Sequence, residues 1–152
     1  MYKKQLQTDQ LNARLQAYME PAKLDRPALG WIKTIRTTLG ISLQQLGKKI
    51  GITKQSMLEM EQREAEGSIT LNALQEAAKA MDMQLVYGFI PKDGSLDALI
   101  EKKANEAAAR IVSRASNSMK LEDQENSEIR IKKAIQERAS ILKSDVSKII
   151  WD

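Results

Sequence analysis

Residues Ser42 to Glu61, SLQQLGKKIGITKQSMLEME, decide the fold of this chain. Ser42, a residue type that caps helix N-termini, precedes apolar residues at positions 43, 46 and 50, which recur at helical spacing. Gly51 can adopt the positive φ of a sharp turn, and Thr53 is a second candidate N-cap. The stretch therefore predicts two short helices joined by a tight turn.

The second of these helices would have two different faces. Its inward face would carry two methionines, at positions 57 and 60, and its outward residues would be Lys54, Gln55, Ser56 and Glu59. A helix that begins with exposed Lys and Gln has the chemistry to reach base edges in a DNA major groove. The pattern is typical of a DNA-reading helix-turn-helix.

The charge of the chain is concentrated around this stretch. Residues 31–63 carry six basic and two acidic side chains, whereas residues 95–152 carry 11 basic and 10 acidic ones. A local positive excess is what attraction to phosphates requires. Solvated helix faces can produce the same imbalance, so the charge supports DNA binding without requiring it.

The composition excludes several kinds of chemistry. The 152 residues include no Cys and no His, so there is no disulfide, thiolate metal site, Cys nucleophile or His general base. No Gly-rich phosphate loop or nucleophile–base pair is present either. We therefore expect no enzymatic activity, no cofactor and no metal. Because no apolar run reaches membrane-spanning length and the N-terminus lacks a signal-peptide core, we expect a cytoplasmic protein without a membrane partner.

Three parts are predicted along the chain. Residues 1–30 would form an N-terminal helix and an arm, because Pro21 and Pro27 interrupt the helical pattern. Residues 31–91 would form the helix-turn-helix domain and end in a short strand. Residues 92–152 would form a C-terminal helical extension for partner binding or dimerisation.

Two further helices complete the predicted domain. In the first, at residues 31–39, we expect the inward residues to be Trp31, Ile32, Ile35 and Leu39. Thr70 is a candidate N-cap for the last helix. Together these helices predict a compact, mainly α domain.

The segment from Met83 to Ile90, MQLVYGFI, has a different character. Its β-branched and aromatic residues, bounded by Asp82 and Pro91, predict a short strand. A lone strand has unpaired backbone groups that usually find a partner. The partner could be another copy of the chain, which would make a homodimer, or the segment could pack flat on the helices.

The C-terminal part has long amphipathic helices. Ser95 is a candidate N-cap for a continuous apolar stripe, and a second stripe follows toward the C-terminus. Such helices must bury their stripes on each other, on a twin subunit or on a different protein.

The stretch from Trp31 to Met81 resembles the Cro/phage-repressor (XRE-type) helix-turn-helix family, and TKQSMLEME resembles the recognition helix of lambdoid phage repressors. The resemblance implies binding to double-stranded operator DNA, with base contacts from Lys54, Gln55 and Glu59. It places Thr53 and Ser56 where phosphate and base contacts mix. With the strand and the C-terminal helices predicted above from the residues, the expected fold is a Cro/phage-repressor-type helix-turn-helix bundle with one short β-strand and a C-terminal helical extension.

Two residues depart from this family pattern. Leu43 stands where many relatives have a phosphate-contacting Gln, so Gln44 or Gln45 would serve instead, and the acidic Glu59 repels phosphates. Gly47 and Glu61 do match the small residue and the acidic residue that the family has at these places. The expected DNA-binding residues are Ser42, Gln44, Gln45, Thr53, Lys54, Gln55, Ser56 and Glu59.

Most of the chain also resembles the bacterial family called mobile mystery protein A. The stretches that carry this resemblance are RPALGWIKTIRTTLG, EQREAEGSITLNALQEAAKAMDMQLVYGFIPK and SMKLEDQ. Members are typically encoded beside a protein with a Fic domain, a domain that commonly transfers AMP to target hydroxyls. The resemblance implies an antitoxin that binds a Fic-domain toxin and represses its own operon.

Ser118 and Glu122 bear on this implication. They match the first two elements of the Fic inhibitory pattern Ser/Thr-x-x-x-Glu-Gly/Asn, with Asp123 replacing the last. Residues four apart share one helix face, so the spacing is physically reasonable. A chain of this composition contains about one such match by chance. The alternative is a stand-alone dimeric repressor whose C-terminal helices only dimerise or sense a ligand.

Overall fold

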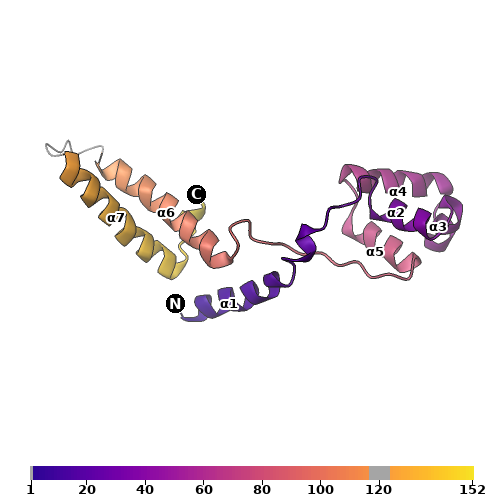
Figure 1. Cartoon of the computed structure of the whole chain (residues 1–152), viewed down its shortest axis with the longest axis horizontal. Helices are drawn as coiled ribbons and strands as arrows, with labels where there is room; N and C mark the ends of the chain where they lie inside the picture. The colour runs from indigo at the N-terminus through magenta and orange to yellow at the C-terminus, as the bar shows by residue number, and fades with distance from the viewer. Residues whose placement is uncertain (1, 117–123) are drawn as a thin grey trace. The chain divides into compact units, whose positions relative to one another are not determined.

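The computed structural model describes residues 2–116 and 124–152. These residues form seven α-helices and two 3-10 helices but no strand, and 71% of the structure is helical. The helices are labelled in Figure 1. The expectation of a mainly α protein is therefore confirmed. The chain divides into two compact units: residues 23–88, here called the bundle unit, and residues 1–22 with 89–152, here called the hairpin unit.

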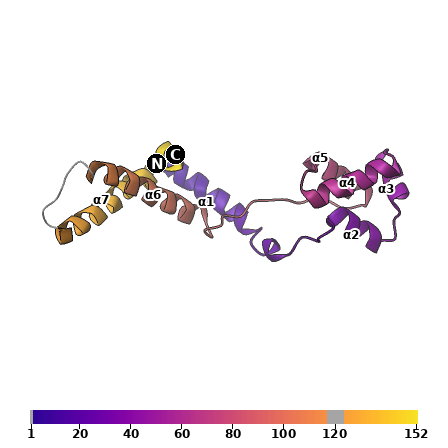
Figure 2. The same ribbon diagram turned by 90° about the horizontal axis from the view of Figure 1, so that it is seen from above.

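The bundle unit consists of four short helices around one apolar core (Figures 1 and 2). Its helices are α2 (Trp31–Thr38), α3 (Leu43–Ile50), α4 (Lys54–Glu66) and α5 (Leu71–Ala80). Each of the four helices contributes at least one buried apolar residue to the core. The buried apolar residues are Ile32, Leu46, Met57, Met60, Ala77 and Met81.

Hydroxyl side chains begin three of these helices, as the sequence predicts. Ser42, Thr53 and Thr70 each accept a hydrogen bond from the backbone N–H three residues later, at 3.0, 3.0 and 3.1 Å. Gly51 and Gly67 end α3 and α4 in the left-handed conformation, with φ of 89° and 86°. The caps satisfy backbone groups that helix ends would otherwise leave unpaired.

The inward face of α2 was predicted only in part. Ile32 is buried and Ile35 packs against the core, but Trp31 and Leu39 are 47% and 54% exposed, so their predicted inward placement is wrong. The buried stripe of α2 runs through Ile32 and Arg36, four residues apart. Each residue step turns a helix by about 100°, which directs Trp31 away from that stripe. Leu39 is the C-cap and lies beyond the last helical turn.

The hairpin unit is built on two long helices, α6 (Leu96–Ser116) and α7 (Gln124–Asp145), which pack side by side (Figure 1). Its other elements are α1 (Tyr2–Gln16), the 3-10 helix η1 (Pro21–Lys23), which runs to the unit boundary, and the terminal 3-10 helix η2 (Lys148–Trp151). Small residues at the α6–α7 contact let the two backbones approach closely. The core residues are Ile100, Ala104, Ala107, Ala108, Ala139, Leu142 and Ile150.

Helix α1 joins the hairpin unit through hydrogen bonds near the ends of the other helices. Lys4 Nζ donates to the Asp145 carbonyl at 2.7 Å, and Asn12 Oδ1 accepts from the Leu96 N–H at 3.0 Å. The predicted division placed residues 1–30 apart, whereas the structure groups α1 with the C-terminal helices. These contacts join residues that are 84 to 141 positions apart, a distance at which no sequence pattern reports contact.

The strand predicted from Met83 to Ile90 is not present in the described residues. A strand is defined by backbone pairing, and this segment has no neighbouring strand among those residues. The alternative of packing flat on the helices is wrong, since Val86 and Phe89 are 75% and 80% exposed and only Leu85 is partly buried. Pairing with another copy stays a prediction.

Candidate nucleic-acid interface

The turn between α3 and α4 is held by one carbonyl. The Gly47 carbonyl accepts from the N–H groups of Gly51 and Ile52, both at 2.8 Å. Gly47 itself is buried against the turn: an added Cβ would lie 2.9 Å from the Ile52 carbonyl oxygen and 3.2 Å from that of Thr53. The close approach of the turn to α3 therefore requires glycine at this position.

A buried ion pair fixes α4 against α2. Arg36 Nε and Nη2 donate to Glu61 Oε2 and Oε1 at 2.7 and 3.0 Å, and Arg36 Nη1 donates to the Ile41 carbonyl at 3.0 Å. The two side chains are 10% and 2% exposed. The hydrogen bond that Arg36 donates to Glu61, together with the negative charge of Glu61, raises the pKa of Arg36 against the opposing effect of burial, so the guanidinium stays protonated.

A second buried carboxylate on α4 caps the start of α2. Glu64 accepts from the backbone N–H groups of Trp31 and Ile32 at 2.9 and 2.8 Å. The preceding Gly30 has φ of 86°, and a Cβ there would lie 2.7 Å from Glu64 Oε1. Gly30 is thus required both by its backbone conformation and by the carboxylate that approaches it.

The buried residues of α4 recur at positions 57, 60, 61 and 64, which form one continuous face. The opposite face carries exposed polar residues. Among the predicted DNA-binding residues, Lys54, Gln55 and Glu59 are exposed there. The contacts of Met57, Met60, Glu61 and Glu64 therefore determine which side chains of α4 face outward.

The eight predicted DNA-binding residues separate into two groups. Four are engaged in capping: Ser42 and Gln45 form a capping box, and Thr53 Oγ1 accepts from the Ser56 N–H and donates to Ser56 Oγ. The other four side chains have no hydrogen bond to any residue that the structure describes, and they are Gln44, Lys54, Gln55 and Glu59. The first group positions the two helices, and the second is available for a ligand.

The charge around this surface is positive. No acidic residue occurs from Trp31 to Leu58. Lys48 and Lys49 in the last turn of α3 and Lys54 at the start of α4 are exposed, and they form no ion pair within residues 2–116 and 124–152. Arg36 and Glu61 were both counted in the charge of residues 31–63. They form an ion pair with each other, so the net positive charge of the remaining residues is the same.

Sequence reasoning missed Gly30 and the partners of Arg36 and Glu64. Arg36 lies four residues after the buried Ile32, and this charge on an apolar stripe was the available signal of a buried pair. The capping role of Glu64 had no local signal, because the helix that it caps begins 33 residues earlier.

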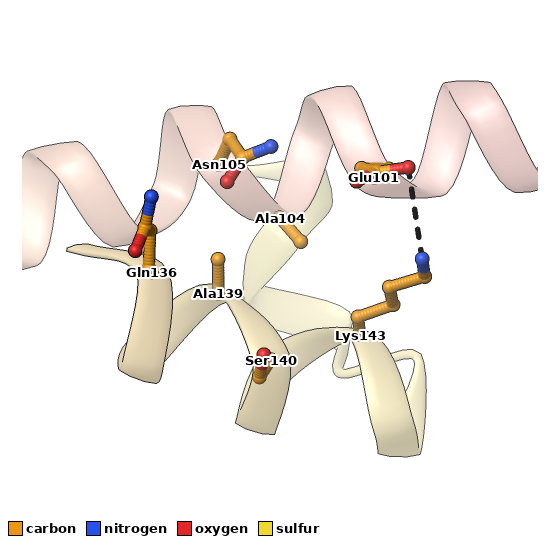
Figure 3. A pocket seen from close by; sticks show the side chains of 7 residues that line it. All are labelled: Glu101, Ala104, Asn105, Gln136, Ala139, Ser140 and Lys143. Carbon is orange, nitrogen blue, oxygen red and sulfur yellow. Dashed lines mark ion pairs between the residues drawn. The ribbon is translucent and has the colours of Figure 1, made fainter. Parts of the chain in front are cut away.

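A hollow between α6 and α7 offers no comparable chemistry (Figure 3). It has a volume of about 180 Å³ and is lined by Glu101, Ala104, Asn105, Gln136, Ala139, Ser140 and Lys143. Its two charged groups face each other, with Lys143 Nζ 3.6 Å from Glu101 Oε2 (Figure 3). The described residues contain no cluster of metal-ligating side chains, and none of their helices is both long and apolar enough to cross a membrane.

The predicted Fic-inhibitory residues Ser118 and Glu122 lie outside the described residues. No protein-family model matches the chain, and no curated protein or solved structure is significantly similar to it. A proposed function therefore depends on the residues and contacts of the chain itself.

Proposed function

We propose that the chain is a sequence-specific binder of double-stranded DNA, with α3 and α4 as its helix-turn-helix. The observation that carries the proposal is the division of α4 into two faces. One face is held by buried apolar and charged contacts, and the other presents the unpaired Lys54, Gln55 and Glu59. A single helix fits the major groove of B-DNA, where Gln can read adenine and Glu can accept from cytosine.

Separate roles follow for the polar groups near this face. Lys54 and Gln55 are assigned to base edges, and Gln44, Lys48 and Lys49 to phosphates. Ser42 and Thr53 cap the two helices, so their backbone positions are fixed before DNA arrives. The resemblance to XRE-type regulators assigns the same helix to base recognition.

The test is to select a duplex site from a random pool and then to measure affinities by fluorescence anisotropy. Gln55→Ala should weaken binding to the selected site by about 1–3 kcal/mol and relax the preference at one base pair. Gln75→Ala is the matched control, because Gln75 is an exposed glutamine on α5. If Gln55→Ala leaves site discrimination unchanged, α4 is not the reading helix.

Phosphate contacts have a different signature. Lys48→Ala should weaken binding about equally for all sequences and reduce the slope of log K against log salt by about one. The exposed Lys79 on α5 provides the control, since Lys79→Ala makes the same charge change away from α3 and α4. Equal effects of the two substitutions would show a response to net charge alone.

We also propose that the chain is an antitoxin and autorepressor that inhibits a Fic-domain AMP-transferase by placing Glu122 at its ATP site. The support is the pattern Ser118-x-x-x-Glu122 together with the resemblance to mobile mystery protein A. The test is co-expression with the protein encoded beside it, followed by AMP-transfer assays. Glu122→Ala should release AMP transfer and leave DNA binding intact, whereas the control Glu128→Ala should leave inhibition intact.

The second candidate is a stand-alone dimeric repressor. It is favoured by the exposed apolar segment that follows α5, which offers a surface for a second copy. A chain that purifies without its genomic neighbour, binds its promoter and does not alter AMP transfer would support this candidate and remove Glu122 from the mechanism.

A further inference from the structure

Residues 84–90 are a strand-forming segment whose backbone groups have no partner. Met83 N–H donates to the Ala78 carbonyl at 2.8 Å, and from Gln84 to Ile90 no backbone or side-chain group hydrogen-bonds to any residue in the described part of the chain. Three of the side chains are largely exposed, at 75% for Val86, 57% for Tyr87 and 80% for Phe89. Unpaired backbone with β-branched and aromatic side chains is a template for strand addition.

We infer that this segment pairs antiparallel with the same segment of a second copy of the chain, in a register centred on Tyr87. The unpaired stretch is symmetric about Tyr87, with three residues on each side. In this register every residue from 84 to 90 lies opposite a residue of the same stretch in the other copy, and no residue at either end is left without an opposite residue.

Side-chain chemistry favours the same register. Leu85, Tyr87 and Phe89 alternate along the segment and share one face. Pairing about Tyr87 sets Leu85 opposite Phe89 of the other copy on both sides of a central Tyr87 pair. A slip by one residue in either direction would lose the Tyr87 pair and both Leu85–Phe89 pairs, and it would set Gly88, which has no side chain, opposite Tyr87 or Leu85.

The charges on and beside the segment favour another copy as the occupant. Residues 83–91 carry no charged side chain, so antiparallel self-pairing brings no like charges together. Asp82 and Lys92 lie in turns just beyond the two ends of the segment, and the register centred on Tyr87 brings Asp82 of one copy to the same end of the pair as Lys92 of the other. Neither side chain has an ion-pair partner among the residues that the structure describes, so the two opposite charges are available to each other.

Cysteine crosslinking tests the register directly, because the full chain contains no cysteine. Directly opposed residues in an antiparallel pair have Cα atoms about 4.5–5.5 Å apart, within the range that a disulfide spans. Tyr87→Cys should therefore form a covalent dimer on mild oxidation. Leu85→Cys and Phe89→Cys should each crosslink poorly alone but efficiently when the two variants are mixed.

The crosslinking control is Leu29→Cys, because Leu29 is 58% exposed and lies outside the segment. If Tyr87→Cys crosslinks no faster than this control, the inference is wrong. If Leu85→Cys or Phe89→Cys crosslinks best with itself, the copies pair in another register, and the pairing about Tyr87 is overturned.

Sedimentation equilibrium without DNA tests the dimer itself. N–H groups of successive strand residues point to opposite edges, so one of Val86→Pro and Tyr87→Pro must remove a donor from the shared ladder. That variant should weaken dimerisation about tenfold, because the bond is lost in both copies. The fluorescence of Trp31 and Trp151 checks that both units stay folded. The inference is overturned if the wild-type chain is monomeric at every concentration, or if neither proline variant weakens the dimer. Neither result excludes DNA binding, which does not depend on this pairing.

Discussion

The buried ion pair between Arg36 and Glu61 gives a sharp test of how the bundle unit is held together. Both side chains are almost fully buried, and three hydrogen bonds satisfy the guanidinium. Removing one partner leaves a buried charge without compensation, which costs about 3–5 kcal/mol. Small domains have total stabilities of only about 5–15 kcal/mol, so Arg36→Met or Glu61→Leu alone should bring the unit close to unfolding.

The double variant Arg36→Met/Glu61→Leu should recover most of this loss. Replacing both members of a buried pair by apolar residues of similar volume is often neutral or even stabilising. One cost remains, because the Ile41 carbonyl loses its donor, and this amounts to about 1–2 kcal/mol. We therefore expect the free energy of unfolding of the double variant to lie within about 2 kcal/mol of the wild-type value. Each single variant should be less stable than the double variant.

The two tryptophans allow each unit to be followed separately. Trp31 belongs to the bundle unit and Trp151 to the hairpin unit, and there is no other tryptophan. In a Trp151→Phe background, urea unfolding followed by fluorescence reports the bundle unit alone. A loss of 3 kcal/mol corresponds to a fall in Tm of roughly 12 °C or more for a domain of this size. If the losses of the two single variants simply add in the double variant, the side chains are not coupled and the reasoning fails.

Three further substitutions test other contacts. Gly47→Ala should destabilise the bundle unit by about 1–3 kcal/mol, because the added Cβ would clash with the backbone of the turn. Gln44→Ala, at an exposed position of α3, is the control and should be close to neutral in the same urea experiment. Glu64→Gln should cost about 1–3 kcal/mol, because the two N–H groups of α2 bond to different carboxylate oxygens and an amide has an NH2 donor in place of one of them. A change below 0.5 kcal/mol, about the scale of a neutral surface substitution, would show that the cap is dispensable. Asn12→Ala should destabilise only the hairpin unit, by about 1 kcal/mol as read from Trp151 in a Trp31→Phe background. An equal change read from Trp31 in the Trp151→Phe background would contradict the division into units.

The sequence was sufficient to predict the features that local chemistry determines. Ser42, Thr53 and Thr70 could be assigned as caps because the preference depends on a bond to a neighbouring residue. The turn at Gly51 followed from the conformational freedom of glycine in the same way. The helices of the bundle unit were accordingly placed close to where the structure has them.

Features that depend on distant partners were not predictable. Glu64 caps a helix that begins 33 residues earlier, and Asn12 caps one that begins 84 residues later. A strand at Met83–Ile90 was predicted from residue type, but a strand exists only when another backbone pairs with it. In the candidate site, the sequence identified the polar residues and assigned Ser42 and Thr53 as caps. It did not show that Gln45 and Ser56 also take part in capping, whereas the side chains of the other four stay free.

Directional contacts explain why α4 can present a defined surface. Burial of Met57 and Met60 favours an inward apolar face, but the hydrophobic effect is not directional and tolerates some rotation of the helix. The carboxylates of Glu61 and Glu64 tolerate much less, because each makes two hydrogen bonds whose geometry is fixed. A rotation of α4 by one residue step, about 100°, would break all four bonds and leave charges buried. The outward position of Gln55 is therefore set by the same register that places Glu61 and Glu64 inside, so the contacts that stabilise the bundle unit also orient its candidate DNA-reading face.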